Sequence, residues 1–155
     1  MSEPALIDRL TDPDPASKSE PASAGQISPR RMREIIRRDL AALLGTVSVD
    51  GRLDLSRHPF VAASALNFGI RDFSGESSDA LDTAAAAREI REAIHRYEPR
   101  LQPDTLSVDV DLHGEARDVL SLSISGVYAP SGESIALEAE IDLETGAARL
   151  VEGRG

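Results

Sequence analysis

The spacing of apolar residues changes at the tripeptide Glu98-Pro99-Arg100, from a helical period before it to strict alternation after it. Proline disfavours helical geometry in the residue before it, so a long helix must end here and Glu98 is pushed towards an extended conformation. A carboxylate at this end of a helix also meets the negative end of the helix dipole. Helix stability therefore does not explain Glu98, and we expect its charge to have a partner.

We call Glu98-Pro99-Arg100 the corner. Two amphipathic helices are predicted before it. The first spans Pro29–Leu44, because Ser28 is a good N-cap, a proline follows it and apolar residues recur at helical spacing. The second spans residues 79–97, with Ser77 or Ser78 as its cap and an apolar face opposite a charged one.

Three antiparallel strands are predicted after the corner, because apolar and polar residues alternate in three runs. The alternating apolar residues are Leu106, Val108, Val110 and Leu112, then Leu120, Leu122 and Ile124, then Ile135, Leu137, Ala139, Ile141 and Leu143. A tight turn leads into a short last strand over residues 147–151. Helices first and strands after indicate an α+β fold with two main helices and a three- or four-stranded, mainly antiparallel sheet.

The segment between the helices, residues 46–75, is long for a loop inside a compact domain, and such loops are more often functional or specially packed than idle. Residues 64–70 are predicted to form a short helix that stops at Gly69. All three phenylalanines, Phe60, Phe68 and Phe73, lie in this segment. We expect them to anchor it to a core that is otherwise mainly aliphatic.

Residues 1–27 are predicted to form an N-terminal arm, and residues 28–155 a single domain. Leu6, Ile7 and Leu10 would share one side of a short helical turn, and the Pro- and Ser-rich stretch that follows is typical of a flexible linker. Such a composition cannot bury enough apolar surface to fold alone. We therefore expect Leu6 and Leu10 to dock on this domain or on another protein, and the sequence leaves both open.

Charge and composition argue against several classes of function. A formal net charge of −10 argues against general nucleic-acid binding, which requires clustered positive charge. The absence of cysteine and the scattered positions of the three histidines argue against a metal site, and we expect no cofactor. No segment reaches the roughly 20 apolar residues of a membrane span, and no secretory signal is recognisable. We expect a soluble, intracellular protein without a small-molecule substrate.

One basic cluster stands out at the start of the first predicted helix: Arg30, Arg31, Arg33, Arg37 and Arg38. One interpretation is a solvated helix face, partly neutralised by Glu34 and Asp39. The functional alternative is a surface that binds a protein, because the planar guanidinium pairs bidentately with carboxylates. In that alternative Arg37 and Arg38 are candidate partner-binding residues.

The order of the motifs resembles a known family. A helix of the form Arg-Arg-Asp-Leu-x-x-Leu-Leu over residues 37–44 is followed by Ser64-Ala65-Leu66-Asn67-Phe68-Gly69, by Tyr97-Glu98-Pro99-Arg100-Leu101 and by strands. Together these are similar to the lysozyme-like baseplate wedge family of contractile phage tails. The arm sequence Leu6-Ile7-Asp8-Arg9-Leu10 resembles the branch found in type VI secretion systems. After Gly69 the family often continues with Leu-Pro-Asp, where this chain has Ile70-Arg71-Asp72.

The resemblance implies a structural role and no enzymatic one. It implies a cytoplasmic subunit, at a baseplate docked on the inner membrane, that joins the baseplate wedge proteins to the first ring of sheath subunits. Glu98, Pro99 and Arg100 match the motif with which the family grips its baseplate neighbours. The exposed sheet edge is expected to pair with sheath strands and so to start sheath polymerisation. We expect alanine at position 98 or 100 to leave the fold intact and to abolish sheath formation.

Three alternatives stay open. Glu98 and Arg100 could simply pair inside the fold, for example with Arg96 or Asp104. The chain could be a peptidoglycan-cleaving muramidase, although no pair of carboxyl groups is recognisable and the arginines beside Glu98 would keep it charged, opposite to what a general acid requires. It could also be an acidic adaptor whose arginine-rich helix binds one protein.

Overall fold

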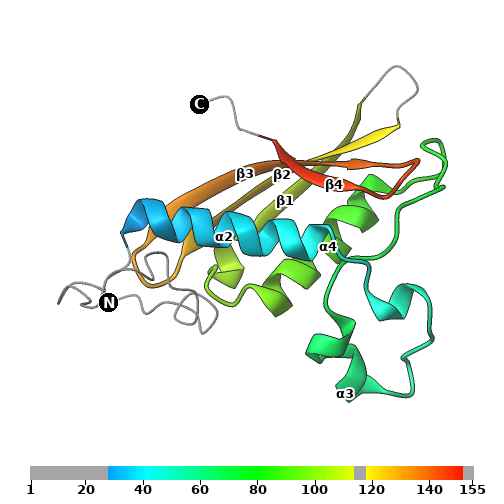
Figure 1. Cartoon of the computed structure of the whole chain (residues 1–155), viewed down its shortest axis with the longest axis horizontal. Helices are drawn as coiled ribbons and strands as arrows, with labels where there is room; N and C mark the ends of the chain where they lie inside the picture. The colour runs from blue at the N-terminus through cyan, green and yellow to red at the C-terminus, as the bar shows by residue number, and fades with distance from the viewer. Residues whose placement is uncertain (1–27, 114–117, 152–155) are drawn as a thin grey trace, which may run out of the picture.

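The computed structural model describes residues 28–113 and 118–151. Two long helices, α2 (Pro29–Leu44) and α4 (Thr83–Tyr97), cover one face of a four-stranded antiparallel sheet (Figure 1). The helices precede the strands along the chain, which confirms the predicted α+β fold. The arm predicted before residue 28 lies outside the described residues.

Helix α2 has the predicted bounds. The hydroxyl of Ser28 accepts a hydrogen bond from the backbone N–H of Arg31 at 3.2 Å, and Gly45 follows the last helical residue. This cap satisfies one of the N–H groups that a helix leaves without a partner at its start. The helix buries Met32, Ile35, Ile36, Leu40, Leu43 and Leu44.

Helix α4 ends at Tyr97, as predicted, but it begins at Thr83 and not at residue 79. Its cap is Asp82, whose carboxylate accepts a hydrogen bond from the backbone N–H three residues on, at 2.9 Å. The predicted caps Ser77 and Ser78 therefore lie before the helix. A carboxylate cap is also favoured by the positive end of the helix dipole.

The sheet has the order β1-β2-β3-β4, and each strand is antiparallel to its neighbour. The elements described after α4 are a short 3₁₀ turn, η3 (Pro103–Thr105), and the strands β1 (Ser107–His113), β2 (Val119–Tyr128), β3 (Glu133–Asp142) and β4 (Ala148–Val151). The register places Val108 opposite Ile124, and Leu122 opposite Ala139. The alternating apolar residues therefore share the face that the helices cover.

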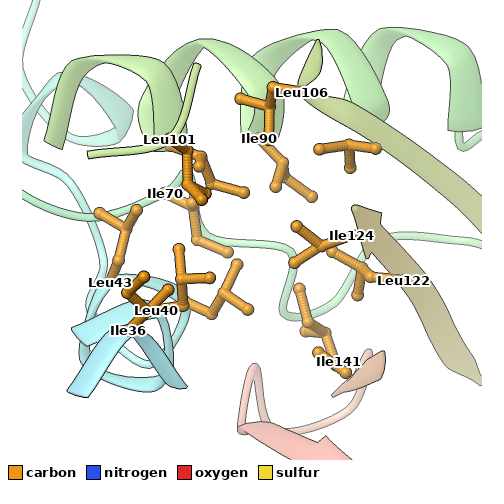
Figure 2. Packing of buried hydrophobic residues seen from close by; sticks show 14 of the residues in the cluster. Ile36, Leu40, Leu43, Ile70, Ile90, Leu101, Leu106, Leu122, Ile124 and Ile141 are labelled. Carbon is orange, nitrogen blue, oxygen red and sulfur yellow. The ribbon is translucent and has the colours of Figure 1, made fainter. Parts of the chain in front are cut away.

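The core is aliphatic apart from Phe73 and Tyr128, as the low aromatic content predicted. Figure 2 shows side chains of the helices, the sheet and the segments that join them converging in it. The labelled residues are Ile36, Leu40, Leu43, Ile70, Ile90, Leu101, Leu106, Leu122, Ile124 and Ile141. Burying each such side chain contributes about 1.5–3 kcal/mol to the stability of the fold. Because these side chains come from both helices and from the sheet, each element is stabilised by packing against the others.

The long segment between the helices contains three short turns: η1 (Val49–Gly51), α3 (Pro59–Ala62) and η2 (Ala65–Asn67). The helix predicted over residues 64–70 is thus a single 3₁₀ turn. Val47 and Ile70 form an isolated parallel bridge that closes the segment at its base. The segment leaves the body of the molecule and returns to it at this bridge (Figure 1).

The prediction that all three phenylalanines anchor this segment is wrong for Phe60. Phe73 is buried, and Phe68 packs edge-on against Tyr97 with 5.2 Å between the ring centroids. Phe60 is 90% exposed. Phe60 lies on α3, which is a single helical turn. This turn lies away from the sheet and so has no core to cover (Figure 1).

We predict that Gly69→Ala destabilises the protein strongly. Gly69 has a φ of 129°, and a Cβ there would lie 2.4 Å from the Thr46 carbonyl oxygen. We expect a loss of roughly 2–4 kcal/mol in the free energy of unfolding, measured by urea denaturation. The matched control is Gly75→Ala, because Gly75 has a φ of 76° but a Cβ there would have no atom within 4 Å, and its cost is about 1 kcal/mol. Equal losses in the two variants would contradict the steric account.

Candidate functional site

Backbone hydrogen bonds hold the corner in place on both sides. The N–H of Glu98 donates to the Ile94 carbonyl at 2.8 Å and completes the last turn of α4. Leu101, just after the corner, forms an antiparallel bridge with Tyr128, the last residue of β2. The corner therefore ties the end of the helix to the end of a central strand.

The carboxylate of Glu98 is paired inside the fold. Glu98 is only 2% exposed, and its Oε1 accepts a hydrogen bond from Nε of Arg100 at 2.6 Å while Oε2 accepts one from Nη2. The expected partner of Glu98 is thus Arg100, two residues further along the chain. Arg96, one of the alternative partners, donates to the Ala62 carbonyl at 3.2 Å, and Asp104 is exposed in η3.

Arg100 also binds helix α2. Its Nη2 donates to Oδ2 of Asp39 at 2.6 Å, and the other oxygen of Asp39 accepts hydrogen bonds from Arg38 at 2.9 and 2.7 Å. The hydrogen bonds to Glu98 raise the pKa of the Arg100 guanidinium, against the opposing effect of its partial burial, and the hydrogen bond to Asp39 raises it further. Glu98, Arg100, Asp39 and Arg38 form an ionic bridge, in which the two signs of charge alternate.

Most arginines of the basic cluster are paired. Arg30 and Arg31 pair with Glu34, Arg33 with Glu133 of β3, and Arg38 with Asp39. Arg37 differs, because within residues 28–113 and 118–151 it forms no ion pair. Its half-buried side chain lines the surface beside the ionic bridge and so remains able to bind a carboxylate there.

A surface groove of about 410 Å³ lies between α2 and β3. It is lined by Arg30, Arg33, Glu34 and Arg37 from the helix and by residues 134–137 from the strand. Within the described residues, strand β4 pairs with β3 over residues 138–141. Residues 133–137 of β3 therefore have β2 on one side and, within the described residues, no strand on the other. We call residues 133–137 the open edge.

The structure brings part of the predicted site together. Arg38 and Arg100 meet through Asp39, and Pro99 is exposed beside them. Asp39 was expected only to neutralise the basic cluster, although it lies within the Arg-Arg-Asp-Leu motif, which was the available signal for its role. The predicted binding residues Leu6 and Leu10 lie outside the described residues.

Two negative findings concern the residues that the structure describes. No three acidic or histidine side chains there converge as ligands of a metal ion would. None of the helices there is both long enough and apolar enough to span a membrane.

Comparison with known families identifies the class of protein. The family model of the baseplate wedge protein gp25 matches residues 30–130, from the start of α2 to just beyond β2. The chain belongs to this family of structural baseplate proteins, which confirms the resemblance seen in the motifs. No curated protein matches the chain significantly.

A solved structure shares the fold. It is the 1.44 Å crystal structure of a protein from Geobacter sulfurreducens whose name places it among the tail lysozymes. It is 18% identical to this chain, with a TM-score of 0.50, and the match covers 84% of this chain and 98% of the other. At this identity the similarity concerns the fold alone.

We predict that Arg100→Ala lowers stability, contrary to the expectation that alanine leaves the fold intact. The change leaves the carboxylate of Glu98, whose side chain is 3% exposed, without its counter-ion. Breaking a buried ion pair in this way costs about 3–5 kcal/mol, which urea denaturation would measure.

The control is the double variant Glu98→Gln with Arg100→Ala. The double variant removes both charges, so it should recover part of the lost free energy of unfolding. The main cost of Arg100→Ala is the buried carboxylate that has no partner. An Arg100→Ala variant as stable as the wild type would contradict the ionic bridge.

Proposed function

We propose that this chain is the gp25-like baseplate subunit of a type VI secretion system, the subunit named TssE. In this role it links the baseplate wedge to the first ring of the sheath and starts sheath polymerisation. Family membership supports a baseplate role, and the arm sequence over residues 6–10 favours the secretion branch. The chain would act in the cytoplasm, at a baseplate docked on the inner membrane.

The corner would contact neighbouring baseplate proteins. Because Glu98 is buried and bound to Arg100, its contribution is to orient the guanidinium, while Pro99 and the part of Arg100 that remains exposed would form the contact. Arg37 and Arg38 would extend the same surface along α2. Leu6 and Leu10 would add apolar contacts from the arm. A surface with several arginines suits a partner that offers carboxylates.

The observation that carries the sheath-initiating role is the open edge beside the groove. Residues 133–137 offer backbone donors and acceptors on their outer side, and an incoming strand would continue the sheet in line with β4. Strand β1 also has an outer edge without a strand in the described part of the chain. The open edge of β3 is favoured, because Arg37 of α2 lines the groove beside it, forms no ion pair within the described residues and would bind a carboxylate of the incoming strand.

A muramidase is disfavoured by the position of Glu98. A glycosidase acid must reach the bond that it cleaves, whereas the carboxylate of Glu98 is buried and bound through both oxygens to a guanidinium. Turnover of peptidoglycan by the purified chain, lost in Glu98→Gln, would contradict the structural role. An acidic adaptor would be favoured if no sheath or baseplate genes lay near the gene for this chain.

We predict that Arg37→Glu abolishes or strongly reduces sheath formation without unfolding the protein. Arg37 has no ion pair in the described residues, so its replacement should change the free energy of unfolding by no more than about 0.5 kcal/mol. Fluorescently labelled sheaths, counted in cells that carry the variant in place of the wild type, are the measurement.

The matched control is Arg88→Glu, an exposed arginine on α4. It makes the same change of charge away from the groove and should support normal sheaths. Normal sheath numbers in both variants would exclude Arg37 from the contact. Normal sheaths in cells that lack the chain altogether would overturn the proposed function itself.

A further inference from the structure

The open edge lacks the features that usually protect the edge of a sheet. Its residues 134–137 are Ser-Ile-Ala-Leu, without a charge or a proline. The register between β2 and β3 is unbroken along the whole of β3, so no bulge turns this edge away. Proteins usually charge, bend or cover such an edge, because its unpaired backbone groups bind other chains. We therefore expect a segment of chain to cover the open edge while no partner strand is bound.

Two apolar residues of the open edge lie on the side of helix α2. Ile135 is buried, and Leu137 is half-buried against the core. Helix α2 lies alongside β3 (Figure 1), and the groove runs between them at residues 134–137. A strand added here continues the pleat of β3, so every second side chain of that strand would face the groove. An occupant therefore needs alternate apolar residues.

One cation of the groove has no ionic partner in the described part of the chain. Arg30 pairs with Glu34 and Arg33 with Glu133, so the charges of these arginines are balanced. Arg37 lines the same groove, and within residues 28–113 and 118–151 it forms no ion pair. The occupant therefore also needs a carboxylate among the side chains that face the groove.

Residues 5–12 of the arm have this pattern. The run is Ala-Leu-Ile-Asp-Arg-Leu-Thr-Asp, with a proline on each side and none within it. In an extended conformation Leu6, Asp8 and Leu10 share one face. Only an extended chain can also bond the backbone groups of the edge, so docking favours this form over the helical turn predicted for the arm.

The arm joins the described part of the chain at the groove. Residue 28 is the cap of α2, and Arg30 already lines the groove two residues later. The fifteen residues 13–27 can span roughly 50 Å, whereas the 16 residues of α2 measure only about 24 Å. A tether of this length holds residues 5–12 at an effective concentration of about 1 mM beside the groove. Weak contacts are therefore enough for docking within one molecule.

We propose that residues 5–12 add as a strand to the open edge of β3 in the same molecule. Leu6 and Leu10 then lie in the groove, and Asp8 pairs with Arg37. The arm covers the edge while the chain is free, and the incoming sheath strand displaces it. The identity of that strand rests on the proposed function.

Displacement requires that docking of the arm is weak. We expect the docked arm to slow hydrogen exchange at the open edge by about tenfold, and a bound sheath strand to slow it further. Once displaced, Leu6 and Leu10 are free for the contact with neighbouring baseplate proteins. The arm thus acts first as a cover for the edge and then as a binding segment.

The test is hydrogen–deuterium exchange over residues 133–137 in the full chain without a partner. The variant that combines Leu6→Asp with Leu10→Asp should exchange about tenfold faster there than the wild type, and equally over β1. The matched control combines Ala16→Asp with Ala22→Asp, which adds the same charge to the tether and should exchange like the wild type. Equal exchange in all three proteins would overturn the proposal.

The predicted ion pair gives an independent readout. Asp8→Arg and Arg37→Asp should each speed exchange at the open edge by about threefold, because each removes one partner of an exposed pair. The chain that carries both changes restores a pair of opposite charges and should recover most of the protection. Exchange in this chain that is faster than in either single variant would contradict the pairing.

The same measurement distinguishes other occupants. A second copy of the chain would protect the edge more at high than at low protein concentration, whereas docking within one molecule is independent of concentration. Residues 152–155, which follow β4, would protect it equally in the variant with Leu6→Asp and Leu10→Asp. Either result would overturn the proposal and leave the proposed function standing. The proposed function fails separately if purified sheath subunit does not slow exchange at residues 133–137 of that variant.

Discussion

The bond network around Arg100 is the constraint on which the arrangement of the molecule depends. Arg100 binds Glu98 at the end of α4 and Asp39 on α2, so one guanidinium sets the last turn of one helix against the middle of the other. Glu98 is buried, and an unpaired carboxylate there would be costly. Pro99 makes the corner rigid and so brings Glu98 and Arg100 together. The positions of both helices are therefore linked to the corner at which the chain turns into the sheet.

Local features of the sequence predicted much of this architecture. Proline and capping residues determine where helices end, and alternation identifies strands, so the bounds of α2, the end of α4 and the sheet followed from short stretches. The start of α4 was not predicted correctly, because Ser77, Ser78 and Asp82 are all good N-cap residues. Only packing determines that Asp82 is the cap. The role of Asp39 was missed for a different reason: its partner lies 61 residues away, and no local pattern predicts such a pair.

The structure changes what the predicted site can do. Glu98 is the residue that the sequence made most conspicuous, yet it is buried and binds Arg100. In the proposed contact it would therefore position Arg100, and its neighbours would touch the partner. Exposure of Phe60 could not be predicted from composition, since a phenylalanine in a loop more often packs inward. The family match covers the ionic bridge, whereas the open edge of β3 lies beyond residue 130. The proposed sheath-initiating role therefore rests on geometry more than on the match.

The proposed function requires a partner strand to add to the open edge of β3. The most direct measurement is hydrogen–deuterium exchange of the purified chain, alone and mixed with the purified sheath subunit of the same organism. An added strand bonds backbone amides, so exchange should slow in peptides covering residues 133–137 and stay unchanged over β1. Slower exchange confined to β1, or no change at either edge, would contradict the account.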